Sequence, residues 1–384
     1  MQTCINRLVL FFSTFFLSVA AFATPGINMP YGVTPISQDI YNLHMAAFYV
    51  CCGIGVIVFG VLIYSLIKYR KSKGAKAALF HEHIGVEIAW TIIPTLILIA
   101  LAIPATIVLQ RIHNTDESKL TLKVTGYQWR WKYEYLDQGI SFFSTLATTQ
   151  DQINNVKPKN DWYLLEVDNP VVIPVNTKVK LLVTSDDVVH AWWVPEIGVK
   201  QDAIPGFINE NWFYATQTGT FRGQCGELCG VNHAFMPIVV QVVSQSDFDQ
   251  WVKAHQSGKT GQAIGNSADH AASASMKEDE LMTLGKEQYE KNCAMCHQNT
   301  GLGLPPTFPA LKGDRIVVGD VSANIHTVLQ GVKGTAMQPF GNQLDDKTLA
   351  AIITYIRHAW GDDELNKAHK FATTVQPQDI AKAR

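Results

Sequence analysis

Two long segments without charge stand out in the first third of the chain. Residues 45–67 and 88–110 contain no charged side chain, and each is long enough for an α-helix to cross the hydrocarbon core of a bilayer, which takes about 20 residues. The short connection between them carries five cations from Lys68 to Lys76, and basic loops of this kind stay in the cytoplasm. The pattern predicts a transmembrane hairpin, within residues 24–115, whose two ends face outward.

A shorter apolar run opens the chain. Arg7 precedes this run, which reaches about Ala20, and the sequence Ala-Phe-Ala follows at residues 21–23. These are the parts of a secretory signal peptide with its cleavage site after Ala23. We therefore expect residues 1–23 to be a signal peptide. The alternative is an uncleaved anchor, which is disfavoured because the run is short for a membrane span.

The pattern changes to short β-branched segments at about residue 116 and keeps this character to residue 255. These segments alternate in part between apolar and polar positions and are separated by turn residues. No stretch resembles a long amphipathic helix before Ser246–His255, so this region is expected to form an all-β sandwich or barrel. The expected strands include Leu120–Val124, Leu164–Val167, Val179–Val183 and Ile238–Val243.

A stretch rich in Gly, Ala and Ser at residues 256–279 has the composition of a flexible linker. A further folding unit is expected at residues 280–384. Its last long helix is expected at Lys347–Trp360, because apolar residues recur there at helical spacing. The chain is thus predicted to be multidomain, with a membrane hairpin, an all-β domain and a helical domain.

Composition narrows the possible classes of function. The chain has a net charge of −2 and only 17% charged residues, which argues against a nucleic-acid partner. Seven cysteines in 384 residues are too few for a disulfide scaffold. Cys4 lies in the expected signal peptide, and Cys51 and Cys52 lie in the first span. The remaining four cysteines form two pairs.

The later pair belongs to the sequence Cys-x-x-Cys-His at residues 293–297. This is the covalent attachment site of a c-type haem, in which Cys293 and Cys296 bind the haem and His297 is the proximal iron ligand. Met337 is the best candidate for the other axial ligand, because Met295 lies inside the attachment loop. A chance motif or a redox-active cysteine pair is the alternative.

The earlier pair, Cys225 and Cys229, lies in a segment that also contains His233 and Met236, and His190 precedes it. Thiolate, imidazole and thioether ligands suit copper better than magnesium or calcium. A mononuclear blue-copper site uses one Cys, so the second thiolate points to a binuclear copper centre. A structural zinc site and a surface disulfide remain as alternatives.

With these residues, the chain resembles subunit II of the haem–copper cytochrome c oxidases, in the caa-type arrangement with a cytochrome c domain fused at the C-terminus. The resemblance runs from the hairpin to the end of the chain. Its motifs are Glu87-Ile-Ala-Trp90-Thr91-Ile-Ile-Pro94, Tyr127-Gln-Trp129-Arg-Trp131, Leu165-Glu-Val-Asp-Asn169, His190-Ala-Trp-Trp-Val-Pro195, Lys200-Gln-Asp202-Ala-Ile-Pro205-Gly206 and the copper loop.

The resemblance implies a fold and a set of metal ligands. The β region would be a cupredoxin-like Greek-key domain, and the last region an all-α class I cytochrome c domain. Cys225 and Cys229 would bridge two copper ions. The remaining copper ligands would be His190, Met236, His233 and the main-chain carbonyl of Glu227. The Glu227 side chain would then face a magnesium ion at the boundary with subunit I.

Two further residues gain a role through the resemblance. Trp129 corresponds to the aromatic residue through which electrons enter the copper centre; without the family, it would be interpreted as a core tryptophan. Glu87 corresponds to the residue at the mouth of a proton path into subunit I, and ionisable residues at such depths are functional candidates. The chain departs from the family pattern at Arg130, where an aromatic residue is usual, and at Phe207, where many members have Arg.

The resemblance implies an electron-input subunit of an aerobic respiratory oxidase. An external c-type cytochrome or a membrane-bound donor would reduce the haem c. Electrons would then pass through the copper centre to the haems of subunit I, where oxygen is reduced to water and protons are pumped. Subunits I and III would be its partners in the bacterial inner membrane, with the copper and haem domains on the periplasmic side. The alternatives are a copper chaperone, a quinol oxidase subunit without copper and a free-standing electron-transfer module.

Overall fold

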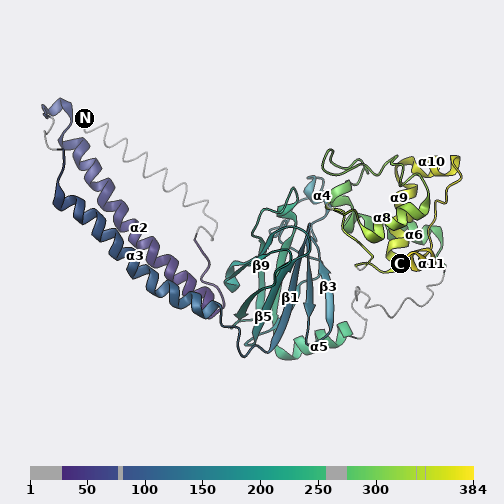
Figure 1. The fold of residues 1–384 in the computed structure, drawn as a ribbon, viewed down its shortest axis with the longest axis horizontal. Helices are drawn as coiled ribbons and strands as arrows, with labels where there is room; N and C mark the ends of the chain where they lie inside the picture. The colour runs from purple at the N-terminus through teal and green to yellow at the C-terminus, as the bar shows by residue number, and fades with distance from the viewer. Residues whose placement is uncertain (1–27, 77–80, 257–274, 334, 342) are drawn as a thin grey trace.

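The computed structural model describes residues 28–76, 81–256, 275–333, 335–341 and 343–384. The predicted signal peptide, residues 1–23, lies outside the described residues, as does most of the predicted linker. Figure 1 shows three parts in a row, with a helical hairpin at one end, a β domain in the middle and a helical domain at the other end.

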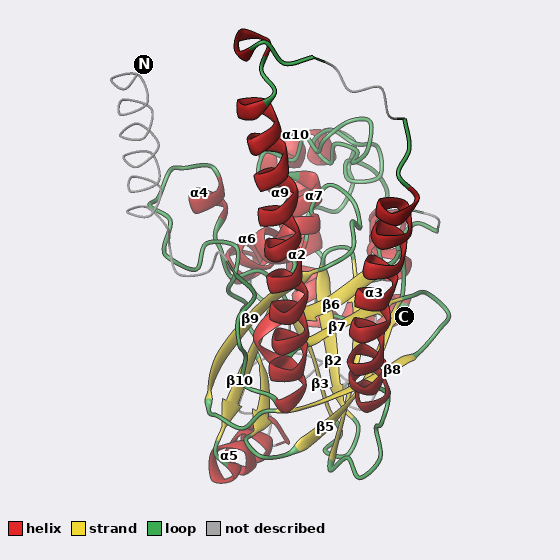
Figure 2. Cartoon of the chain, turned by 90° about the vertical axis from the view of Figure 1, so that its left-hand side faces the viewer, coloured by secondary structure: helices red, strands yellow, loops and turns green. Residues whose placement is uncertain are grey.

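The hairpin consists of two long antiparallel helices, α2 and α3 (Figures 1 and 2). Both extend beyond the predicted spans, and both are long and apolar enough to cross a membrane. Almost all of their apolar side chains are exposed within the chain, which is expected if lipid covers them. The bounds are α2 Pro35–Lys68, the short helix η1 Lys71–Lys73 and α3 Ile84–Ile112.

The start of α2 is bound to the β domain. Thr34 caps the helix by accepting a hydrogen bond from the main-chain nitrogen of Ser37 at 2.9 Å, which satisfies one of the free N–H groups of the first turn. The Thr34 hydroxyl also donates to the main-chain oxygen of Ile197 at 2.8 Å. The hairpin therefore joins the β domain through a buried, hydrogen-bonded contact.

The β domain is a sandwich of two five-stranded sheets. Their strand orders are β3-β2-β1-β5-β8 and β4-β10-β9-β6-β7. The parallel pairs β1–β5 and β4–β10 join segments far apart in sequence. The first sheet contains β1 Leu120–Tyr127, β2 Arg130–Tyr135, β3 Ile140–Ser144, β5 Lys178–Ser185 and β8 Asn209–Tyr214. The second contains β4 Val171–Pro174, β6 His190–Val194, β7 Val199–Ala203, β9 Gly219–Cys225 and β10 Pro237–Val243.

The core of the sandwich explains why these segments form strands. In β5 every second side chain is buried, as expected for a strand with one face on the core. The largest buried side chains come from both sheets, and the indole nitrogen of Trp192 donates to the Tyr133 hydroxyl across the core at 3.2 Å. The fully buried residues include Leu122, Trp131, Tyr133, Ile173, Leu181, Trp192 and Val240.

One predicted strand is wrong, and the terminal helix of this domain is confirmed. Residues 164–167 form a turn with a single bridge between Val167 and Leu146, and Leu164 has a φ of 61°, which strand geometry does not allow.

The helix α5 (Gln245–Gln256) covers the end of the domain, where Trp251 packs on Tyr135 with ring centroids 5.0 Å apart. The other short elements are α4 Gln150–Ile153, η2 Pro195–Ile197 and η3 His233–Phe235.

The C-terminal domain is helical. The crossing of α6 and α9 forms its centre, and a Cβ at Gly285 would lie 2.1 Å from the main-chain oxygen of Ala351, so only glycine permits this close approach. The predicted closing helix ends at His358 rather than at Trp360, which has a φ of 61°. The helices are α6 Glu278–Asn292, α7 Ala294–His297, α8 Val321–Gln330, α9 Asp346–His358, η4 Ala359–Gly361, α10 Asp362–Ala368 and α11 Pro377–Ala383.

Candidate functional site

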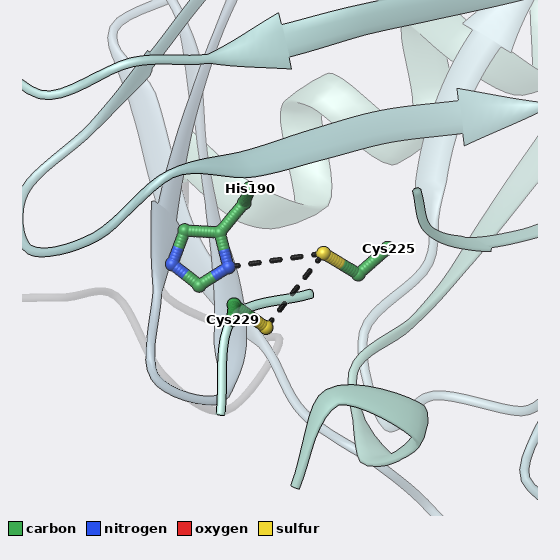
Figure 3. A group of neighbouring side chains, drawn as sticks. All are labelled: His190, Cys225 and Cys229. Carbon is green, nitrogen blue, oxygen red and sulfur yellow. Dashed lines mark hydrogen bonds between the residues drawn. The ribbon is translucent and has the colours of Figure 1, made fainter. Parts of the chain in front are cut away.

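A cluster of two thiols and an imidazole lies at one end of the β sandwich (Figure 3). His190 is the first residue of β6 and Cys225 is the last residue of β9. These strands are antiparallel neighbours, with Trp192 opposite Cys225. The start of β6 therefore lies beside the end of β9, and the sheet brings His190 and Cys225 together. The donor atoms of His190, Cys225 and Cys229 all lie within 4.8 Å of one another, and all three residues are buried.

The loop after β9 adds the remaining predicted copper ligands. The Cys229 Sγ lies 3.5 Å from the His233 Nδ1 and 3.6 Å from the Met236 Sδ. The Cys225 Sγ lies 3.3 Å from the main-chain oxygen of Glu227. The Glu227 side chain is exposed. The structure therefore brings together every donor group that the sequence singled out for copper.

The two thiols depend on each other for their charge. Their sulfur atoms are 3.8 Å apart. A hydrogen bond from Cys229 lowers the pKa of Cys225, with a further contribution from His190. The pKa of Cys229 is raised, first by this interaction with Cys225 and then by burial. The pair therefore favours the thiolate form at Cys225 over that at Cys229, and a metal bound here would require both sulfur atoms to be deprotonated. A site with two cysteine sulfur atoms, two imidazoles and a thioether offers the soft donors that copper prefers.

A carboxylate that the sequence analysis missed orients the histidine. The Asp187 Oδ1 lies 2.9 Å from the Nε2 of His190, so the other ring nitrogen, Nδ1, faces the Cys225 Sγ at 3.8 Å. Burial lowers the pKa of His190, but the hydrogen bonds with Asp187 and Cys225 outweigh it and the net shift is upward. Carboxylates in this position fix the tautomer of a metal-binding histidine. The sequence feature that could have indicated this role is the position of Asp187, three residues before the predicted copper ligand His190.

Trp129 lies directly against the copper loop. Its indole nitrogen donates to the main-chain oxygen of Cys229 at 3.1 Å, and the Gln128 side chain donates to the same oxygen at 2.7 Å. A Cβ at Gly230 would lie 2.9 Å from the Trp129 ring. On its other side, Trp129 packs edge-on against Phe308 of the helical domain, with ring centroids 5.7 Å apart. Trp129 therefore connects the copper loop with the helical domain.

A cavity of about 850 Å³ lies beyond this contact. It is lined by Cys293, Cys296, His297 and Met337, the four residues predicted to hold the haem. Ligand pockets of roughly 300–1,000 Å³ accommodate molecules of cofactor size. Many apolar side chains line the cavity, and residues of the β domain, Trp129 among them, close one side of it. The volume, the lining and the motif all fit a haem.

Burial disfavours charge on the side chains that are predicted to hold the haem. Burial raises the pKa of Cys293 and of Cys296 to about 12, so both are thiols at neutral pH. Burial also lowers the pKa of His297. The His297 Nδ1 donates to the main-chain oxygen of Pro309 at 3.0 Å. A ring held in this way leaves its Nε2 free to bind a metal.

Glu87 belongs to the hairpin and lies apart from both sites. It is in the first turn of α3, where its Oε1 accepts a hydrogen bond from the main-chain nitrogen of His83 at 3.3 Å. This contact stabilises the helix start. The proton-path role of Glu87 stays a prediction.

Three family models match successive parts of the chain. The model for the transmembrane domain of cytochrome c oxidase subunit II matches residues 23–108, and the model for its periplasmic domain matches residues 120–243. Residues 280–356 match the model for subunit III of the cbb3-type cytochrome c oxidase. The matches follow the division into hairpin, β domain and helical domain.

Curated relatives agree with these matches. A protein of Rickettsia bellii described as "Probable cytochrome c oxidase subunit 2" is 40% identical over 64% of this chain and 89% of its own length. A protein of Rickettsia felis with the same description is 37% identical over 65% of this chain and 82% of its own length.

Among solved structures, the periplasmic domain of subunit II of the cytochrome oxidase of Bradyrhizobium japonicum matches with 44% identity and a TM-score of 0.34. The match covers 38% of this chain and 99% of that domain. The family implies binding of copper and haem, association with other oxidase subunits and a periplasmic domain on a membrane anchor. By its matches and its relatives, the chain belongs to the cytochrome c oxidase subunit II family.

Proposed function

We propose that this chain is the electron-input subunit of an aerobic respiratory cytochrome c oxidase and that it carries a binuclear copper centre and a covalently bound haem c. One observation carries the proposal: a run of contacts leads from the cavity, through Phe308 and Trp129, to the thiol cluster. Phe308 lines the cavity together with Cys296, Phe308 packs on Trp129, and the Trp129 indole donates to the main-chain oxygen of Cys229.

The distances between donor atoms support the choice of copper ligands. Cys225 and Cys229 would hold both copper ions, because each has an imidazole near its sulfur. His190 lies nearer to Cys225, whereas His233 and Met236 lie next to Cys229. The Glu227 carbonyl is the sixth donor, beside Cys225. A buried site of fixed geometry gives up and accepts electrons with little rearrangement.

The cavity supports the choice of haem ligands, because all four line it. Cys293 and Cys296 would attach the haem, and His297 and Met337 would bind its iron. When bound, the two cofactors supply one-electron oxidation and reduction at the two ends of the run of contacts. The chain holds their ligands in place, and the apolar part of the lining provides a surface for the haem.

Further residues and partners complete the proposal. The exposed Glu227 side chain offers a carboxylate for magnesium at the boundary with subunit I, and Glu87 lies at the mouth of a proton path. The partners are subunits I and III and an external c-type cytochrome or membrane-bound donor. The chain is anchored in the bacterial inner membrane by α2 and α3, after removal of a signal peptide, and its domains are 24–115, 116–255, 256–279 and 280–384.

The test uses the full chain purified in detergent. Metal analysis should give two copper ions per chain, with an electron paramagnetic resonance signal of one unpaired electron shared between them. Cys225→Ser should remove this signal and leave the haem spectrum, whereas Met337→Ala should change the haem spectrum and leave the copper signal. One copper per chain would contradict the binuclear centre. Oxygen consumption at enzyme-like rates without subunit I would contradict the electron-input role.

A further inference from the structure

We propose that Arg130 is a positioning residue that holds the chain's own cytochrome domain against the copper loop, so that the tethered domain itself occupies the face through which electrons enter. We call this face, formed by Gln128, Trp129, Arg130 and Asn232, the docking face. The proposal rests on the proposed function, and it concerns the one position of the aromatic motif at which this chain has a cation.

Arg130 reaches out of the β domain and into the helical domain. It is the first residue of β2, yet it is only 6% exposed. Its guanidinium donates to the Asn292 Oδ1 at 3.2 Å and to the Gln338 Oε1 at 3.3 Å, and it also donates to the Gln343 Oε1. All three acceptors belong to the helical domain. A planar group with five donors is suited to such a divergent set of acceptors.

Aromatic rings from both domains enclose the same guanidinium. Its central carbon lies 4.4 Å from the ring centroid of Phe143 in β3 and 5.1 Å from that of Phe340 in the helical domain. Cations over aromatic faces are attracted to them, and most strongly where water is excluded. The contact with Phe143 lies within the β domain, whereas the contacts with Phe340 and with the three amides exist only when the two domains are together.

Among the described residues, no carboxylate accepts a hydrogen bond from Arg130, although the negative charge of Asp168 acts on its guanidinium. Its hydrogen-bond acceptors are neutral amides, and burial lowers its pKa to about 10. A surface arginine of a free-standing copper domain would be fully hydrated, and burying it is costly unless every donor is satisfied. Three hydrogen bonds to amides of the helical domain offset part of this cost, so the burial of Arg130 depends on docking.

Contacts on both sides of Arg130 extend the docking face. The Gln338 side chain donates to the main-chain oxygen of Gln128 at 2.6 Å, next to the predicted haem ligand Met337. The Asn232 side chain donates to the main-chain oxygen of Met295 at 3.4 Å, within the attachment motif. The face therefore meets both segments that provide haem ligands. A separate protein donor cannot reach Trp129 while these contacts persist.

The step that docking serves is a single electron transfer. The electron lost by the cytochrome domain is the electron gained by the copper domain, and no bond or proton is exchanged. An external reduced c-type cytochrome supplies that electron to the cytochrome domain. Because the two domains share one chain, docking is intramolecular and its strength sets the fraction of time in which the domains are close enough for transfer.

The experiment compares Arg130→Gln with the wild-type full chain carrying both cofactors. Pulsed electron paramagnetic resonance measures the distribution of distances between the copper centre and the haem iron. A photoreduction experiment measures the rate of intramolecular electron transfer. The matched control is Arg222→Gln, because Arg222 also stacks on an aromatic ring of the β domain, Trp162, at 3.8 Å, but the structure gives it no contact with the cytochrome domain.

We expect Arg130→Gln to broaden the distance distribution and to reduce the docking equilibrium constant about tenfold, which corresponds to about 1.4 kcal/mol. The transfer rate should fall in proportion to the docked fraction. Arg222→Gln should match the wild type. Gln343→Ala, on the other domain, should have a smaller effect of the same kind, and the double variant should lose less than the sum of the two single losses.

The outcomes separate this proposal from the proposed function. If Arg130→Gln keeps both cofactor signals and also keeps the wild-type distances and rate, Arg130 does not hold the domains together. If Arg130→Gln does not fold, Gln343→Ala carries the test, and unchanged distances in that variant overturn the proposal. A chain that lacks the copper or haem signal in its wild-type form contradicts the proposed function instead.

Discussion

Asp187 offers a specific test of how the copper site is supported. Its two oxygens have different tasks: Oδ1 faces the His190 Nε2 at 2.9 Å, and Oδ2 accepts from the main-chain nitrogen of Gln128 at 2.7 Å. Asp187→Asn keeps the shape of the side chain but provides only one oxygen. The new amide nitrogen must then face either the His190 ring or the Gln128 N–H group, and one hydrogen bond is lost.

The expected magnitude follows from these contacts. Loss of a carboxylate that orients a metal-binding histidine typically costs about 10–100-fold in metal affinity, which corresponds to about 1.4–2.7 kcal/mol. A buried donor left without an acceptor costs about 1–3 kcal/mol, which is the same range. We therefore expect copper to bind Asp187→Asn about 10–100-fold more weakly than it binds the wild type.

The assay is a competition for copper between the full chain and a chelator of known affinity. Asp186→Asn is the matched control, because Asp186 is the neighbouring carboxylate and is exposed. It should bind copper as the wild type does. Equal affinity of Asp187→Asn and Asp186→Asn would refute the argument that Asp187 orients His190.

Three further predictions concern the cytochrome domain. Replacement of Cys293 and Cys296 by Ser should leave the haem extractable by acidified organic solvent, because the covalent bonds are lost; haem that stays with the protein would contradict the attachment site. Met337→Ala should lower the haem reduction potential, since a methionine ligand raises it, and potentiometric titration with an unchanged midpoint would exclude Met337 as a ligand. Arg357→Met should destabilise the domain by about 3 kcal/mol in thermal unfolding, because three main-chain oxygens lose a buried donor. The Arg357 guanidinium donates to the oxygen of Val317 at 2.7 Å and to those of Gly319 and Ala372 at 2.8 Å. A melting temperature equal to that of the wild type would contradict this.

Local patterns predicted the parts of the fold that depend on local physics. The absence of charge at 45–67 and 88–110 is enough to indicate two spans, because lipid excludes charge over a fixed length. The alternating pattern of β5 reflects burial of one face. The cysteine, histidine and methionine donors of the copper loop lie within twelve residues of one another, from Cys225 to Met236, so their proximity could be predicted from spacing alone.

Contacts between distant segments could not be predicted in this way. Leu164, Leu165 and Val167 are apolar residues of kinds found in strands, but the chain turns at Leu164, which has a φ of 61°, and Val167 has a single bridging partner, Leu146. The role of Asp187 depends on its geometry with His190 rather than on its residue type. Likewise, the charge of Arg130 suggests an exposed position, and only the packing of a domain that begins about 150 residues later buries it.

The most direct test of the account is the order in which the two centres of the chain receive electrons. The full chain is mixed under anaerobic conditions with a reduced c-type cytochrome, and the haem and copper absorptions are followed in time. We predict that the haem is reduced first, that copper reduction follows at a rate independent of protein concentration, and that copper in the Cys293→Ser/Cys296→Ser variant, prepared without haem, is reduced far more slowly. Copper reduction before the haem, or at the wild-type rate in that variant, would contradict the account.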